Sequence, residues 1–138
     1  ILGYYSALAK RESIPFHGQA DVPAQIGIDE IDMCLILSNL LENAIQASQK
    51  TEPSRRKVNA SIYLQYDRLL LIQVENTFDG EIKKKNGIFQ SSKRPGNGIG
   101  IQSICRLAEK NNGASSFTCE NGIFTAKIML RVKTKEHA

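Results

Sequence analysis

Long hydrophobic runs are missing from this sequence, whose longest uninterrupted apolar stretch is Met33 to Leu37. A membrane-spanning helix needs a run of about 18 apolar residues, so nothing here predicts one. The sequence also lacks a signal peptide, an internal repeat and a low-complexity segment. With 138 residues, the chain has room for one hydrophobic core and one domain, residues 1–138.

Cysteine and histidine are scarce. Cys34, Cys105 and Cys119 show no metal-binding spacing, and an odd number of cysteines argues against a disulfide framework. We interpret them as small core side chains in a reducing cytoplasm. His17 lies in a strand-like stretch and is expected at the surface or the edge of the core, whereas His137 lies in the charged tail.

The most informative segment that is present runs from Pro95 to Ile104 and reads PGNGIGIQSI. Three glycines at every second position, Gly96, Gly98 and Gly100, lead directly into a segment with helical hydrophobic spacing. A glycine-rich turn that opens a helix presents unpaired N–H groups at the positive end of the helix dipole. This pattern is typical of a phosphate-binding turn, although glycines before a helix often serve only a tight turn.

A second informative segment lies inside a long helical pattern that begins near Asp29. Asn39 and Asn43 are one turn apart, and Glu42 and Gln46 fall on the same stripe. Asn is a poor helix former, so two of them on one face indicate a function beyond contact with solvent. The oxygen of an amide side chain is a suitable ligand for Mg²⁺. The opposite, buried face is expected to hold Ile31, Leu35, Leu37, Leu40, Leu41, Ala44, Ile45 and Ala47.

The remaining periodicity predicts the layout of the fold. A helix covers the first dozen residues, a short strand spans Ile14 to Ala20, and strands follow at Val58–Tyr66 and Leu69–Glu75. A long polar loop runs from 76 to 97, then a helix ends at Gly113, and two strands flank the hairpin signal Asn121-Gly122. The order predicts an α+β fold: a two-layer sandwich with a mixed, mostly antiparallel sheet and about three helices on one face.

Together, NLLENA and GNGIGI resemble the asparagine box and the second glycine box of the GHKL ATPase superfamily. The likeness covers nearly the whole chain and is strongest to the catalytic ATP-binding domains of bacterial sensor histidine kinases. Within these, the opening helix ILGYYSALAKRESIPF and the stretch DMCLILSNLLENAI are similar to the peptide-pheromone (quorum-sensing) receptor kinases. The resemblance implies ATP and Mg²⁺ as cofactors.

The resemblance also implies site residues. Asn43 matches the magnesium-ligating Asn, Asn39 the polar position one turn earlier, and Glu42 an acidic position that polarises the acceptor. The phosphate-wrapping turn corresponds to Gly96, Asn97, Gly98, Ile99 and Gly100. Lys93 matches a lid lysine near the terminal phosphates, and Thr125 resembles the threonine of the last strand pair near the adenine.

Two positions depart from the family pattern. The first glycine box normally places an Asp against the adenine amino group, but the sequence here is Asn76-Thr77-Phe78-Asp79-Gly80, in which only Gly80 keeps the glycine pattern. Gln46 stands where many histidine kinases place a phosphate-binding Lys. Both departures predict weaker nucleotide binding than in the family and leave the predicted fold unchanged.

Positive charge gathers in three clusters within a net charge of +4. We interpret Arg55-Arg56-Lys57 as a solvated loop, whereas Lys83–Lys85 and Lys93-Arg94 flank the nucleotide loop and can attract an anionic triphosphate. Binding of nucleic acid needs a basic face with aromatic platforms or a recognition helix, and the sequence shows neither.

The sequence thus predicts a protein-histidine kinase catalytic domain that passes the γ-phosphoryl group of Mg·ATP to a histidine on a separate dimerisation domain of the same receptor, and so acts indirectly on a response regulator. Because the chain begins at Ile1 within an apolar helical face, we expect a fragment of a longer receptor, a cytoplasmic domain of a membrane-bound protein that makes no membrane contact itself. Two alternatives stay open: a nucleotide-degenerate interaction module, and a serine kinase of the anti-sigma-factor type.

Overall fold

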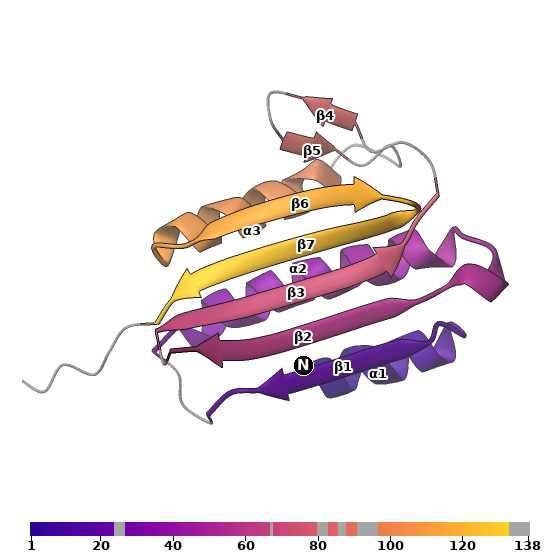
Figure 1. The fold of residues 1–138 in the computed structure, drawn as a ribbon. Helices are drawn as coiled ribbons and strands as arrows, with labels where there is room; N and C mark the ends of the chain where they lie inside the picture. The colour runs from indigo at the N-terminus through magenta and orange to yellow at the C-terminus, as the bar shows by residue number, and fades with distance from the viewer. Residues whose placement is uncertain (24–26, 67, 80–82, 86–87, 91–96, 133–138) are drawn as a thin grey trace, which may run out of the picture.

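The computed structural model describes residues 1–23, 27–66, 68–79, 83–85, 88–90 and 97–132, with the backbone alone for 83–85, 88–90 and 97–99. It shows a two-layer α+β sandwich in which three α-helices cover one face of a mixed five-stranded sheet (Figure 1). The predicted fold class is therefore confirmed.

The helices are α1 (Leu2–Arg11), α2 (Glu30–Gln49) and α3 (Asn97–Lys110), with a short 3-10 turn η1 (Pro53–Arg55) after α2. The main sheet is built from β1 (Phe16–Asp21), β2 (Val58–Gln65), β3 (Leu69–Thr77), β6 (Ala114–Glu120) and β7 (Ile123–Arg131). Its strand order is β1-β2-β3-β7-β6; β1 runs parallel to β2, and the other neighbours are antiparallel. The connection through α2 makes the parallel pair possible.

Helix α2 is the central helix of the covering layer, and its start agrees with the sequence. The Asp29 side chain caps it by accepting hydrogen bonds from the N–H groups of Ile31 and Asp32, at 2.8 and 3.1 Å. The predicted buried face is wrong in its first two turns, because Ile31 is 70% exposed and Leu35 47%. The side chains that α2 does bury are Asp32, Ile36, Leu37, Leu40, Leu41, Ala44, Ile45 and Ser48.

The pairing of the buried Asp32 explains why Ile31 faces solvent. Its carboxylate accepts hydrogen bonds from the Lys110 ammonium and the Asn111 amide at the end of α3, both at 3.2 Å. A buried carboxylate must be paired, so α2 turns Asp32 toward α3 and Ile31 toward solvent. The α2–α3 pair is thereby fixed at the end of the helix layer remote from the start of α3.

The region between β3 and α3 contains more regular structure than the sequence predicted. Strand β3 continues two residues further than expected, to Thr77, so that Asn76 lies in the sheet and not in a loop. A small antiparallel sheet of β4 (Lys83–Lys85) and β5 (Ile88–Gln90) follows, and in Figure 1 it lies beyond β6 near the start of α3. The expectation of one long irregular loop is therefore wrong.

The turns are set by residues with positive φ. Asn121 (φ 53°) and Gly122 (φ 76°) form the β6–β7 hairpin turn, as predicted from their sequence. At the end of α3 the left-handed residue is Asn112 (φ 55°). Gly113 is needed for a different reason from the predicted cap, since a Cβ there would overlap the carbonyl group of Met129 on β7.

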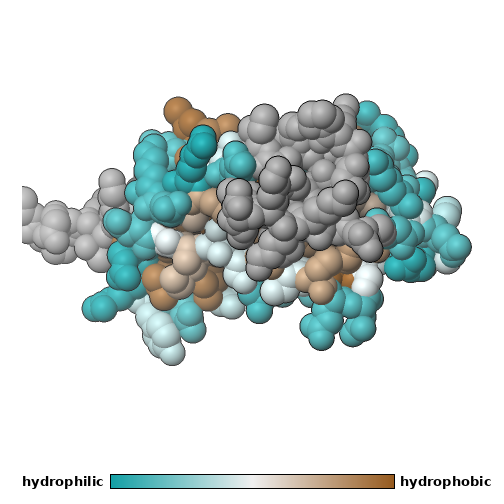
Figure 2. Space-filling view, turned by 90° about the horizontal axis from the view of Figure 1, so that it is seen from above, coloured by the Kyte–Doolittle hydropathy of each residue, from teal (hydrophilic) through white to brown (hydrophobic). Residues whose placement is uncertain are grey.

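The surface also corrects the interpretation of the cysteines as core side chains. Cys34 and Cys119 are exposed, and Cys105 is half-buried with the Ser115 hydroxyl 3.2 Å from its sulfur. On the coloured part of the face in Figure 2, hydrophobic residues form small areas separated by hydrophilic ones. Among the described residues, no helix combines the length and apolar character needed to cross a membrane.

Candidate functional site

The asparagine-rich stripe and the glycine-rich turn, far apart in the sequence, meet between α2 and α3. A Cβ built on Gly100 would lie 3.6 Å from Nδ2 of Asn43 and 3.7 Å from Oδ1 of Asn39. Both asparagines are half-buried. The first turn of α3 therefore faces the polar stripe of α2 with no side chain of Gly100 between them.

The start of α3 has the chemistry of an anion site. Asn97, Gly98, Ile99 and Gly100 form its first turn, whose N–H groups have no partner within the helix. The helix dipole adds partial positive charge at the same point. Gly80, Lys93 and Gly96, the other residues expected to contact the nucleotide in this region, lie outside the described residues.

Asn43 is the side chain predicted to bind Mg²⁺, and its surroundings fit that ion. Mg²⁺ prefers oxygen ligands and usually takes only one or two from the protein, the others coming from water and phosphate. No three His, Cys, Asp or Glu side chains converge on a common point in the described part of the chain, so a metal cage made by the protein alone is not found there. An amide oxygen beside a phosphate-binding turn is a donor set suited to a metal carried by the phosphates.

Glu42 lies next to Asn43 but points toward α1. Its Oε2 accepts a hydrogen bond from the hydroxyl of Tyr5 at 3.1 Å. Burial raises the pKa of Tyr5. A side-chain hydrogen bond with Ser38 lowers this pKa, whereas the Glu42 carboxylate raises it further. Glu42 remains exposed, so the tyrosine holds a carboxylate that solvent or a partner can still reach.

The other end of α2 joins the strands through a hydroxyl network. Ser48 Oγ and Thr77 Oγ1 are 3.0 Å apart, and the N–H of Lys57 donates to both, at 3.0 and 3.2 Å. This network fixes the end of β3 against α2. It lies five residues beyond Asn43, or roughly 7.5 Å along the helix axis at 1.5 Å per residue.

Asn76 is held beside this network. It is only 3% exposed, and its Nδ2 donates to the carbonyl oxygen of Thr77 at 2.9 Å. Turning the amide over would bring Oδ1 against that carbonyl oxygen, so the bond fixes which way the amide points. One N–H of the amino group is thus used within the protein, and the oxygen is the acceptor that Asn76 can offer to a ligand.

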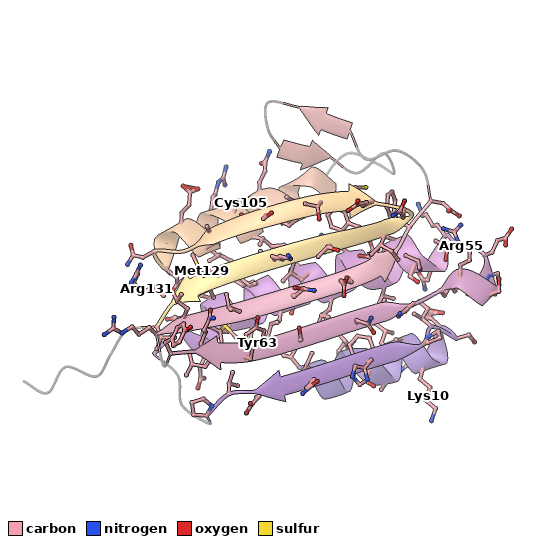
Figure 3. All side chains as sticks on the ribbon, viewed as in Figure 1. Lys10, Arg55, Tyr63, Cys105, Met129 and Arg131 are labelled. Atoms are coloured by element: carbon pink, nitrogen blue, oxygen red, sulfur yellow. The ribbon has the colours of Figure 1, made fainter. Side chains whose placement is uncertain are left out.

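The structure does not place the Thr125 side chain on the same face of the sheet as Asn76. Thr125 pairs with Glu75 and Thr118, and its neighbours Ala126 and Ile128 alternate with it into the core under the helices. Its side chain therefore lies on the uncovered face of the sheet, where Tyr63 and Met129 are also seen in Figure 3. A hollow of about 290 Å³ on that face is lined by Tyr63, Leu71, Gln73, Lys127 and Met129, among others.

Phe124, one residue earlier, is the β7 residue paired with Asn76, and the sequence analysis missed it. The alternation in IFTAKIMLR was the available signal, because Phe124, Ala126, Ile128 and Leu130 share one face and Thr125, Lys127 and Arg131 the other.

The first basic cluster lies between α2 and β2 with Arg55 and Lys57 exposed, as the sequence suggested, but its arginines also make specific contacts. Arg55 forms an ion pair with Asp79 at 2.7 Å, and it lies at the end of the sheet where β3 finishes (Figure 3). Arg56 donates to the carbonyl oxygens of Gln49 and Thr51, at 2.8 and 3.3 Å, and so satisfies orphan groups at the end of α2. Arg55 thus holds the start of the segment after β3, and Arg56 holds the end of α2.

Comparison with known protein families agrees with this geometry. A GHKL-domain profile matches residues 28–131, which is most of the chain. The chain belongs to the GHKL family. A comparison with curated proteins finds no match.

Solved structures identify the subclass of fold that this chain shares. The nucleotide-free catalytic domain of histidine kinase ThkA superposes with a TM-score of 0.73 at 17% identity, covering 94% of this chain and 90% of that one. The mycobacterial sensor histidine kinase MprB gives 0.69 at 17%, covering 96% and 93%. Acinetobacter baumannii histidine kinase AdeS gives 0.68 at 13%, covering 94% and 60%. At these identities the likeness is one of fold.

Proposed function

We propose that this chain is the ATP-binding catalytic domain of a sensor histidine kinase. The observation that carries the proposal is the approach of Gly100 to Asn39 and Asn43, because it brings a helix start suited to anions close to two amide groups. Membership of the GHKL family and the fold shared with histidine kinase catalytic domains support it.

The nucleotide is proposed to lie along α2. Phosphates would bind at the start of α3, and Gly80, Lys93, Gly96 and the turn Asn97–Gly100 would contribute to their binding. The base would lie at the far end of the site, where Asn76 is held near Ser48 and Thr77. The spacing of roughly 7.5 Å along α2 between Asn43 and Ser48 leaves room for a ribose between these two ends.

Mg²⁺ would be held by Asn43 together with the phosphates, and when bound it would neutralise charge on the oxygens of the transferred group. The protein's own part is positioning: the α3 N–H groups would orient the triphosphate, and Gly100 allows the start of α3 to lie close to the asparagines of α2. Gln46 adds no positive charge where many kinases have lysine, so neutralisation depends on the metal and on basic residues of the segment before α3.

The acceptor is proposed to be a histidine of a separate dimerisation domain. One of its imidazole nitrogens would attack the γ-phosphorus, and the bond from that phosphorus to the β,γ-bridging oxygen would break as ADP leaves with the electron pair. Glu42, exposed and held by Tyr5, is the carboxylate that can accept the N–H of the other imidazole nitrogen. This would orient the attacking ring and stabilise its developing positive charge.

The finer assignment to the peptide-pheromone (quorum-sensing) receptor kinases also remains a proposal. It is supported by the likeness of the first helix and of the DMCLILSNLLENAI stretch to that group. It would make the chain the cytoplasmic signalling part of a membrane-bound receptor that acts on a response regulator.

Two measurements test the function. Calorimetric titration of ATP, with and without Mg²⁺, should give a micromolar to millimolar Kd that depends on the metal. With γ-labelled ATP and a separately produced dimerisation domain, label should appear as acid-labile phosphate on that domain and not on this chain alone. No heat at millimolar nucleotide would instead support an interaction module, and acid-stable label on serine would support the serine-kinase alternative.

A further inference from the structure

Strand β7 places an aromatic side chain at the proposed base end of the site. Phe124 lies directly opposite Asn76 in the sheet register, and Val58 lies on the other side of Asn76. Directly paired residues share a face, and Val58 is fully buried under the helices. Phe124 and Asn76 therefore both point into the layer that contains α2.

Phe124 is part of an aromatic group that stays partly accessible. Its ring meets Phe78 edge-to-face with 6.5 Å between centroids, and it stacks with Phe117 at 6.1 Å with 19° between the planes. All three side chains are half-buried. These contacts hold the Phe124 ring in place on the same face of the sheet as the buried Asn76 amide.

The combination is one that recognises a purine. A planar base gains dispersion and electrostatic stabilisation against an aromatic surface, and one oriented acceptor can receive the hydrogen bond of an exocyclic amino group. Asn76 can supply that acceptor through Oδ1, because the bond from its Nδ2 to Thr77 fixes which way the amide points. No other described residue of β7 shares a directly paired position with Asn76.

We propose that Phe124 is a base-binding residue of this chain: the base lies against the Phe124 ring while the Asn76 oxygen accepts its amino group. The inference rests on the proposed function, and it replaces Thr125, which lies on the uncovered face, as the β7 contact to the nucleotide.

The test compares Phe124→Leu with Thr125→Ala, its matched control on the other face of the same strand. Leu keeps an apolar side chain in the layer and removes only the aromatic surface. Affinities for Mg·ATP and for magnesium triphosphate without a base are measured by calorimetry. We expect Phe124→Leu to lower the affinity for Mg·ATP roughly tenfold and to leave the affinity for magnesium triphosphate unchanged. Thr125→Ala should change neither affinity.

Packing effects are separated by Phe117→Leu, which loses a ring stacked on Phe124 but is not paired with Asn76. It should lose less ATP affinity than Phe124→Leu. Wild-type affinity for ATP in a folded Phe124→Leu protein would overturn the inference, as would equal losses for both ligands. A wild-type chain that binds neither ligand would overturn the proposed function itself.

A second readout does not depend on Phe124→Leu folding. The chain has no tryptophan, so Phe124→Trp and Thr125→Trp each introduce a single tryptophan whose emission can be followed. Adenine nucleotides should change the emission of Phe124→Trp, while inorganic triphosphate should not, and Thr125→Trp should respond to neither. Identical responses of the two variants to ATP would contradict a base contact at position 124.

Discussion

The hydroxyl of Tyr5 on α1 donates to the carboxylate of Glu42 on α2 at 3.1 Å, so the acidic residue of the asparagine box is tied to a helix outside the box. Tyr5 is 6% exposed, whereas its neighbour Tyr4 is 67% exposed and meets it only edge-to-face. The pair Tyr4 and Tyr5 therefore offers a matched comparison for the contribution of this contact.

We expect Tyr5→Phe to lower the free energy of unfolding at pH 7 by about 0.5–1.5 kcal/mol, the usual contribution of one hydrogen bond, and Tyr4→Phe to leave it unchanged. Urea denaturation followed by circular dichroism measures both. If Glu42 also acts on the acceptor, Tyr5→Phe should lower the rate of phosphoryl transfer while the affinity for ATP stays the same.

The same tyrosine predicts a pH dependence. Its pKa in the folded chain is raised above the ordinary value of 10.0, chiefly by burial, so the folded state favours the protonated hydroxyl. This contribution to stability is complete below pH 10.0 and is lost as the pH rises through the folded-state pKa. Wild-type unfolding free energy should fall more steeply in that range than that of Tyr5→Phe; parallel curves would contradict the assignment.

Gly100 separates stability from binding. An added methyl group would make ordinary contacts with Asn39 and Asn43, so Gly100→Ala should fold and gain up to about 0.5–1 kcal/mol of helix stability. Gly100→Ala should nevertheless weaken the binding of Mg·ATP about tenfold or more, because the methyl group enters the space between the first turn of α3 and the asparagines of α2. Gly3→Ala on α1, where nothing lies within 4 Å, is the control for helix stability without loss of binding.

Thermal unfolding and calorimetry on Gly100→Ala and Gly3→Ala together decide this point. Wild-type ATP affinity in Gly100→Ala would mean that the nucleotide does not bind where Gly100 approaches the asparagines.

Asn76→Asp tests the departure in the first glycine box. From sequence alone, the carboxylate should tighten ATP binding, provided that the pocket is partly wet. The 3% exposure of Asn76 and its bond to the Thr77 carbonyl oxygen do not meet that condition. We therefore expect Asn76→Asp to cost roughly 1–3 kcal/mol of stability, because a carboxylate cannot donate to that carbonyl and is poorly solvated there.

The control is Gln73→Glu, which adds a carboxylate to the same strand on the uncovered face opposite Lys127. It should leave the urea midpoint nearly unchanged. A folded Asn76→Asp protein with wild-type stability and tighter ATP binding would restore the expectation from the sequence.

Hydrophobic periodicity and glycine placement are local signals, and they predicted the order of the three helices and of the strands of the main sheet. The meeting of the two motifs was implied by the resemblance to the GHKL superfamily. The prediction was wrong where a contact with a residue distant in the sequence determines the local structure. Ile31 fits a buried helical face by spacing, yet Asp32 takes the inward position because Lys110 and Asn111 are there to pair with it. Gly113 looked like a cap, but its cause is the backbone of β7 passing close by.

On the proposal for Phe124, the choice of Thr125 from the sequence lies one position away in the strand. A shift of one residue moves a side chain to the other face of a sheet, and residue chemistry alone favoured the hydroxyl. The cysteines were assigned to the core because of their average behaviour, which says nothing about the strand edge or helix surface where Cys119 and Cys34 lie.

The most direct test of the nucleotide site is a titration of ATP into wild type and Asn43→Ala, each with Mg²⁺ and with EDTA. If Asn43 lies beside the bound metal, Asn43→Ala should lose at least about tenfold affinity with Mg²⁺, or roughly 1.4 kcal/mol, and almost none with EDTA. Equal losses under both conditions, or no metal dependence in wild type, would contradict a magnesium-dependent nucleotide site between α2 and α3.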